Sequence, residues 1–160
     1  MRFEHEIRYD AAPAEVYAML SDPAFREKVC AAQHAHDSSV NIAVDGNGMS
    51  VVVDQKRPSD GVPHFARKIV GDEIHIRQTE SWSDPSRAAL DVAIPGKPGH
   101  LKGSVTIQSG GSGSVETVSG EIKVHLPLVG GKLEHLIGQI LESALKAEER
   151  VGRAWLAGDR

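Results

Sequence analysis

The residue whose type and position best suit it to chemistry in this chain is Glu80. It falls in phase with Ile74, Ile76 and Trp82 in an alternating stretch. The alternation therefore predicts that its carboxyl group lies on the inner, apolar face of a strand. Gln78 lies on the same face and forms a polar patch with it. A buried carboxylate is costly unless it is paired or protonated, so the patch requires an explanation.

Two interpretations of Glu80 are open. In the functional one, it orients a ligand hydroxyl or carbonyl group, or it acts as an acid or base with a raised pKa. In the structural one, the strand end reaches solvent, or Glu80 pairs with Arg67, Arg77 or Arg87.

Eight histidines raise the question of a metal site. The closest pair is His34 and His36, next to Asp37, and an H-x-H pair on a strand could bind zinc. This segment is typical of a helix end or loop, and no third ligand stands at a recognisable spacing. We therefore expect a polar loop here, with no metal and no other cofactor. His5 or His64 could face an interior cavity and serve as a general base.

Motifs for several other chemistries are absent from the sequence. There is no G-x-S-x-G elbow, no phosphate loop and no G-x-G-x-x-G motif. The single cysteine, Cys30, excludes an internal disulfide and cysteine-rich zinc sites, and we expect it to be a small buried hydrophobic residue. The 18 basic and 22 acidic side chains give a net charge of −4, so no basic footprint for nucleic acid is expected.

The elements that must position these residues follow from the spacing of apolar side chains. Alternation predicts a first strand at 3–9, followed by short helices that begin near Pro13 and Pro23. Glycine-rich turns between β-branched runs then predict antiparallel hairpins. Six further strands are expected, at 40–44, 51–53, 73–82, 88–94, 101–107 and 118–126. The segment 65–70 fits either a short helix or a strand extension.

The longest predicted element is an amphipathic helix over residues 132–155, about 36 Å long. A curved sheet must cover its apolar face, and only this helix and the short pair are available to do so. The predicted fold class is α+β, with a curved antiparallel sheet of about six to seven strands wrapped on a long C-terminal helix and two short helices after the first strand. We expect one domain over residues 1–160, with a cavity under the helix.

Two segments carry a resemblance that covers essentially the whole chain. The first strand runs into Pro13 and then Asp22-Pro23, and the last strand runs through Pro127 and Gly130-Gly131 into the long helix. This order resembles the helix-grip fold of the START-like (SRPBCC) superfamily, which includes polyketide cyclases, aromatase/cyclase domains, ubiquinone-binding proteins and pollen-allergen-like lipid binders. The resemblance implies an internal apolar cavity that binds or reshapes hydrophobic small molecules.

The primary functional prediction is intracellular binding of a hydrophobic small molecule, such as a lipid, an isoprenoid or a polyketide-like compound, between sheet and helix. One alternative is a cyclase-, aromatase- or hydrolase-type enzyme that uses Glu80 with a cavity His or Tyr. Another is a protein-interaction scaffold with a filled core. The predicted ligand-binding residues are Glu80, Gln78, Trp82, Tyr9, Leu90, Val92, Val105, Ile122, Val124, Leu133, Ile137 and Leu141.

The expected location is the cytoplasm. No stretch approaches the ~20 apolar residues that a membrane span needs, and the N-terminal residues lack the apolar run of a signal peptide. We therefore expect a soluble protein with a small-molecule partner, without nucleic-acid binding and without integral membrane association.

Overall fold

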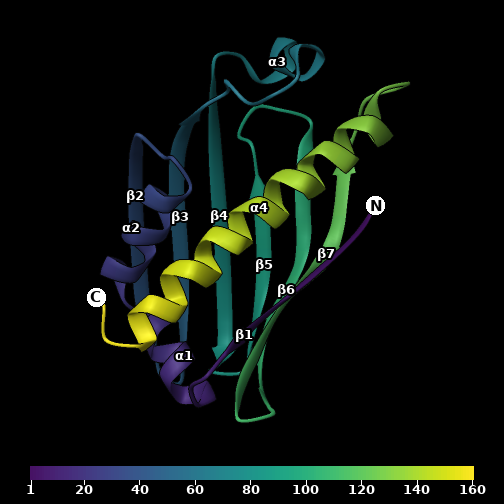
Figure 1. Cartoon of the computed structure of the whole chain (residues 1–160). Helices are drawn as coiled ribbons and strands as arrows, with labels where there is room; N and C mark the ends of the chain where they lie inside the picture. The colour runs from purple at the N-terminus through teal and green to yellow at the C-terminus, as the bar shows by residue number, and fades with distance from the viewer.

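The computed structural model describes residues 1–160 as a seven-stranded antiparallel sheet with four helices (Figure 1). The strands are β1 (Arg2–Tyr9), β2 (Asp37–Asp45), β3 (Gly48–Pro58), β4 (Glu73–Asp84), β5 (Arg87–Ala93), β6 (Gly99–Gly110) and β7 (Gly113–Val124). The helices are α1 (Pro13–Leu20), α2 (Pro23–Ala32), α3 (His64–Val70) and α4 (Gly130–Leu156). The predicted fold class, α+β with a helix-grip arrangement, is confirmed.

The strand order in the sheet is β1-β7-β6-β5-β4-β3-β2. Strands β2 to β7 are each hydrogen-bonded to the next along the chain, and β1 pairs with β7 at the opposite edge from β2. Helices α1 and α2 carry the chain from one edge to the other. Gly103 and Gly120 pair across β6 and β7, and a Cβ atom at Gly103 would lie 1.8 Å from the carbonyl oxygen of Ser119. The backbones therefore approach too closely there for any side chain.

Helix α4 is 27 residues long, about 40 Å at 1.5 Å per residue. It crosses one face of the sheet diagonally in Figure 1, with α1 and α2 at its C-terminal end and α3 at the far end of the sheet. Trp155, near the C-terminal end of α4, meets the Phe25 ring of α2 edge-on at 5.6 Å between centroids. The main hydrophobic core fills this end of the molecule, which leaves the other end of the helix less tightly covered.

The elements differ from the sequence prediction mainly at their boundaries. The segment 65–70 is helical and belongs to α3, and α4 begins two residues earlier than expected. The glycine-rich segment 109–114 contains only a two-residue turn, because β6 and β7 stay paired as far as Gly110 and Gly113. Gly111 occupies that turn with φ of 59°, a conformation that glycine adopts without strain.

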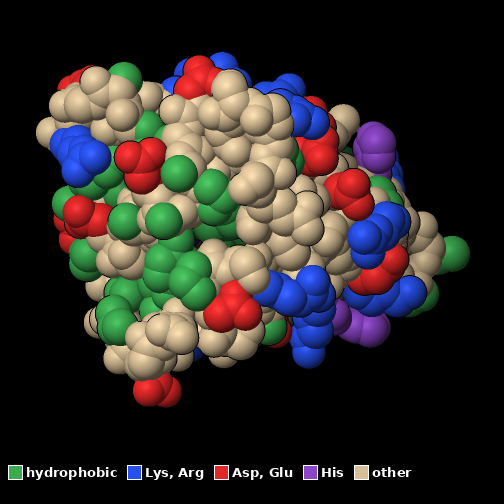
Figure 2. Space-filling view, turned by 90° about the horizontal axis from the view of Figure 1, so that it is seen from below, with side chains coloured by type: hydrophobic (Ala, Val, Ile, Leu, Met, Phe, Trp, Pro, Cys, Tyr) green, Lys and Arg blue, Asp and Glu red, His purple; other side chains and the backbone are tan.

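The surface seen from below the view of Figure 1 carries a mixture of acidic and basic side chains (Figure 2). Hydrophobic side chains gather on one side of this view, and Lys and Arg lie among Asp and Glu rather than in a continuous basic face. None of the four helices combines the length and the apolar character that crossing a bilayer demands.

Candidate functional site

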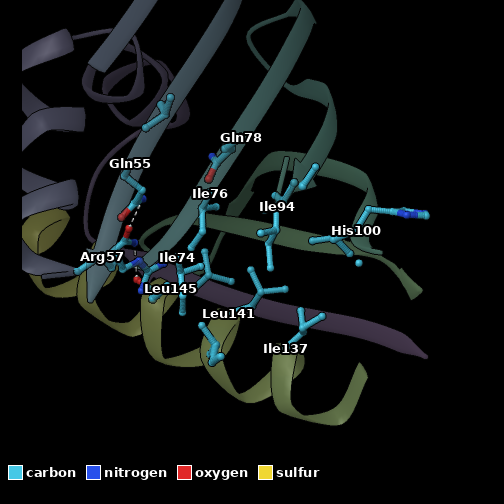
Figure 3. Close-up of a pocket in the computed structure, with 18 of the residues that line it drawn as sticks. Gln55, Arg57, Ile74, Ile76, Gln78, Ile94, His100, Ile137, Leu141 and Leu145 are labelled. Carbon is cyan, nitrogen blue, oxygen red and sulfur yellow. Dashed lines mark hydrogen bonds between the residues drawn. The ribbon is translucent and has the colours of Figure 1, made fainter. Parts of the chain in front are cut away.

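A cavity of about 350 Å³ lies between α4 and the inner face of the sheet. Hydrophobic residues make up 27 of the 42 that line it, so its interior suits an apolar ligand. Ile137, Leu141 and Leu145 recur at four-residue steps and therefore share one face of α4. In Figure 3 they point toward Ile74 of β4 and toward Ile94, which directly follows β5.

Ten of the twelve predicted ligand-binding residues line this cavity. They are Gln78, Glu80, Trp82, Leu90, Val92, Val105, Val124, Leu133, Ile137 and Leu141. A role in ligand binding stays a prediction for each of them, because lining a cavity does not by itself establish contact with a ligand.

The other two, Tyr9 and Ile122, are not among the residues that line the cavity. Both side chains are on the inner face and are buried, at 3% and 0% exposure. However, α4 packs directly against β1 and β7 there. A Cβ atom at Gly152 would lie 2.6 Å from the Tyr9 hydroxyl, and one at Gly138 would lie 3.7 Å from Ile122. The helix therefore covers these residues and leaves no space above them.

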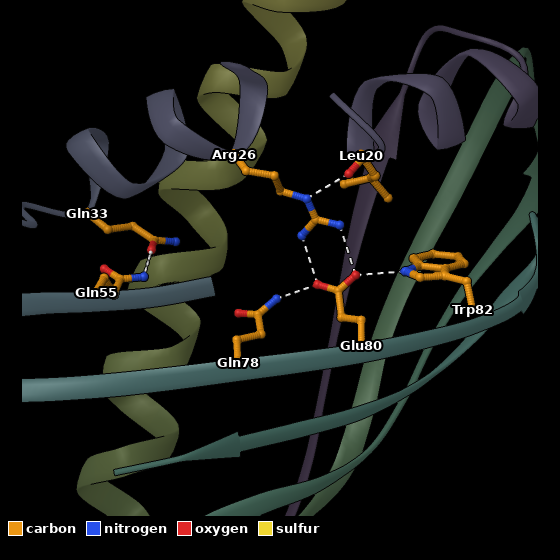
Figure 4. A network of polar contacts seen from close by, with 7 residues as sticks. All are labelled: Leu20, Arg26, Gln33, Gln55, Gln78, Glu80 and Trp82. Carbon is orange, nitrogen blue, oxygen red and sulfur yellow. Dashed lines mark hydrogen bonds and ion pairs between the residues drawn. The ribbon is translucent and has the colours of Figure 1, made fainter. Parts of the chain in front are cut away.

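Glu80 is the centre of a closed polar network at one end of the cavity (Figure 4). The Arg26 guanidinium donates two hydrogen bonds of 2.8 Å to its two carboxylate oxygens. The Trp82 indole N–H donates a third at 2.8 Å, and the Gln78 amide donates a fourth. Glu80 is only 2% exposed and Arg26 only 4%. The four donors saturate the carboxylate, so this arrangement is a buried bidentate ion pair.

Glu80 forms an ion pair, as the structural interpretation expected, but its partner is none of the three arginines that were predicted. Arg77 lies on the outer face and donates to Asp54, and Arg67 donates to backbone carbonyls. The partner is instead Arg26 on α2. Its Nε donates to the carbonyl of Leu20 at 2.7 Å.

The pKa of Glu80 also departs from the expectation. Burial alone would raise it, but the adjacent Arg26 charge and the hydrogen bonds from Arg26, Trp82 and Gln78 lower it below its ordinary value. A lowered pKa does not fit the acid or base with a raised pKa that was one form of the functional interpretation, whereas a role in orienting a ligand stays a prediction.

Two further carboxyl groups, those of Glu116 and Glu148, line the same cavity and were not singled out from the sequence. They are 3% and 8% exposed, and Oε1 of Glu116 has no hydrogen-bond partner. Burial raises the pKa of Glu116 well above its ordinary value, and the neighbouring Glu148 raises it further. Burial also raises the pKa of Glu148 to about 7, although Arg26 opposes the rise. One arginine thus stands among three carboxyl groups, and two of these favour the protonated form.

The sequence did carry a signal for these residues. Glu148 follows Leu141 and Leu145 on the apolar stripe of α4, and Glu116 precedes Val118 on the inner face of β7. A charged residue in phase with an apolar stripe is the pattern that identified Glu80, and it applied equally to both.

The histidines lie elsewhere than predicted. Neither His5 nor His64 lines the cavity, whereas His100 does, with its ring centroid 5.5 Å from that of His125. His36 lies 2.9 Å from a carboxylate oxygen of Glu73. No cluster of three or more His, Cys, Asp or Glu side chains is arranged to hold a metal ion. Cys30 is buried, as expected.

Comparison with known sequences identifies a family. Residues 4–156 match the family described as protein of unknown function (DUF2505). The chain belongs to this family. A similar curated sequence is the uncharacterized protein Rv0481c of Mycobacterium tuberculosis, which is 28% identical to this DUF2505 chain over 123 residues, 72% of this chain and 70% of that protein.

Solved structures similar to the DUF2505 chain share its fold. The protein TTHA0849 from Thermus thermophilus superposes with a TM-score of 0.66 and 19% identity, over 100% of both chains. The di-domain ARO/CYC protein StfQ from the steffimycin biosynthetic pathway superposes with a TM-score of 0.67 and 13% identity, over 96% of this chain and 49% of that one. Helix-grip proteins of the polyketide ARO/CYC type are therefore among the structural neighbours.

Proposed function

We propose that residues 1–160 act as one START-like helix-grip domain that binds a hydrophobic small molecule, such as a lipid, an isoprenoid or a polyketide-like compound, in the cavity under α4. The observation that carries this proposal is the cavity itself, which is about 350 Å³ in volume and mainly apolar. Cavities of this size and character are typical of small-molecule sites. The open space beneath α4 does not favour the alternative of a filled-core scaffold.

The energetics of burial alone limit the Kd of a purely apolar ligand to about 10 μM or weaker. A ligand that loses about 300 Å² of apolar surface to the cavity gains roughly 7 kcal/mol. Part of this gain is offset by the freedom that the ligand loses on binding. The closed Arg26–Glu80 network offers no free donor, so at this end of the cavity the apolar walls must supply the affinity.

Native mass spectrometry tests the proposal. The purified protein is measured before and after denaturation and organic extraction, and the extracted apoprotein is then incubated with decan-1-ol and with 2-naphthalenemethanol. We expect a one-to-one mass increment with a neutral hydrophobic molecule. The bare protein mass in every sample would contradict the proposal.

A second candidate function is acid–base catalysis on a bound hydrophobic substrate, as in a cyclase or aromatase. Glu116 and Glu148 favour it, since a protonated carboxyl group beside one with a pKa of about 7 can donate and accept protons near neutral pH. They replace Glu80 and a cavity His or Tyr as the candidate pair. Glu148→Gln should then abolish turnover of a polyketide-like substrate while its binding persists. Equal turnover by the variant and the wild type would exclude this role.

A further inference from the structure

Arg57 is a cavity-lining cation without a partner. It lies near the end of β3, opposite Ile74 of β4, and it lines the cavity. Its Nε atom is buried and has no hydrogen-bond partner. Burial lowers the pKa of Arg57, and the Cys30 thiol is the one other group that affects it. Arg57 is partly buried and forms no ion pair, so removing its Nε from water is not compensated by an anion.

The protein itself cannot supply that complement from within the cavity. Glu80 pairs in register with Val51, six residues from Arg57 on β3, which is roughly 20 Å along the strand. Glu116 and Glu148 act on the pKa of Arg26, which is bonded to Glu80, whereas neither affects the pKa of Arg57. The cavity therefore has an acidic cluster around Arg26 and, apart from it, the unpaired cation Arg57, with the exposed Lys97 also in its lining.

A second unpartnered polar atom lies on the same face of β3, two residues from Arg57. The side chain of Gln55 is 5% exposed, and its amide nitrogen donates to Gln33 at 3.0 Å (Figure 4). Its Oε1 atom is buried and has no partner. Both unpartnered atoms lie beside the apolar wall that Ile74 and Leu145 help to form (Figure 3). Of the two atoms, only the Arg57 Nε can donate to an anionic end of a ligand whose apolar body lies along this wall, because the Gln55 oxygen is itself an acceptor.

We propose that the cavity ligand is a hydrophobic molecule with a carboxylate group, which pairs with Arg57 while its apolar body lies against Ile137, Leu141 and Leu145. This inference rests on the proposed binding function and names the chemical class of the ligand. A planar carboxylate matches the fork of a guanidinium, and its single charge equals that of one arginine. The other end holds three carboxyl groups and one arginine that is already paired with Glu80, so it offers the ligand carboxylate no free cation, which fixes the orientation of the ligand.

Matched pairs of ligands test the proposal. Decanoate is compared with decan-1-ol, and 2-naphthoate with 2-naphthalenemethanol, by calorimetric titration at pH 8, where both acids are ionised. The proteins are the wild type, Arg57→Gln, and the control Arg150→Gln, which removes an exposed arginine of α4 that does not line the cavity. We expect the wild type to bind at least one acid about tenfold more tightly than its alcohol. Arg57→Gln should abolish that preference without weakening alcohol binding more than about threefold, and Arg150→Gln should change neither.

The outcomes separate this inference from the proposed function. If the alcohols bind but the acids are not preferred, or if Arg57→Gln retains the preference, the carboxylate proposal is overturned and hydrophobic binding stands. If the wild type binds none of the four probes, both fail. Without ligand, Arg57→Gln should unfold at the same temperature as the wild type or higher, because it removes an uncompensated charge. Should the variant not fold, the preference of the wild type for acid over alcohol decides the question alone.

Discussion

The pKa of Glu148 leads to a quantitative prediction about the pH dependence of stability. Its folded value of about 7 lies above the ordinary value of 4.5 that it has in the unfolded chain. Folding therefore favours the protonated form, so this group stabilises the fold at low pH and its contribution is lost as pH rises from 4.5 through 7. At about 1.4 kcal/mol per pH unit, the loss amounts to about 3 kcal/mol between pH 4 and pH 8.

The substitution Glu148→Gln should remove this loss. We expect the variant to match the wild type near pH 4 and to exceed it by about 3 kcal/mol at pH 8, or roughly 6–12 °C in Tm for a chain of this length. Urea unfolding at pH 4, 5, 6, 7 and 8 measures the difference. The exposed Glu142→Gln on the same helix is the matched control, since Glu142 pairs only with Lys146 at the surface. If the free energies of unfolding of the wild type and of Glu148→Gln differed by the same amount at every pH in this range, the reasoning would be refuted.

Two further predictions concern packing and charge. Arg26→Met removes the one cation bonded to Glu80 and leaves that buried carboxylate uncompensated. Chemical unfolding should therefore show a loss of about 3–5 kcal/mol in the free energy of unfolding. A variant as stable as the wild type would show that the pair is not needed. Gly152→Ala places a methyl group 2.6 Å from the Tyr9 hydroxyl and should cost about 1–3 kcal/mol in the same measurement. Gly131→Ala, which meets no atom within 4 Å, should be neutral or stabilise α4 by up to about 1 kcal/mol. Equal effects of the two alanines would contradict the packing at Gly152.

The fold was largely predictable because its elements have clear periods. The alternation along β4 placed Glu80 on the inner face, and the three- and four-residue steps of α4 located the covering helix. Both signals are local, because the period of a strand or helix alone decides which face each side chain occupies.

The site was only partly predictable because its contacts are long-range. Glu80 and Arg26 are 54 residues apart and meet only when α2 packs over the sheet, so no local spacing identifies the pair. Tyr9 and Ile122 are on the correct face but lie beneath α4. Which part of the inner face remains open depends on the diagonal path of that helix, and periodicity carries no information about it.

The claim that the cavity under α4 binds a hydrophobic molecule is tested most directly by titration with the neutral dye N-phenyl-1-naphthylamine. Two variants are compared with the wild type. Ala144→Phe fills the cavity from α4, and the control Ala157→Phe changes an exposed residue at the C-terminal end of that helix. The account predicts saturable one-to-one binding by the wild type and Ala157→Phe, with affinity at least tenfold weaker in Ala144→Phe. No saturable binding by the wild type, or equal affinity in all three folded proteins, would contradict it.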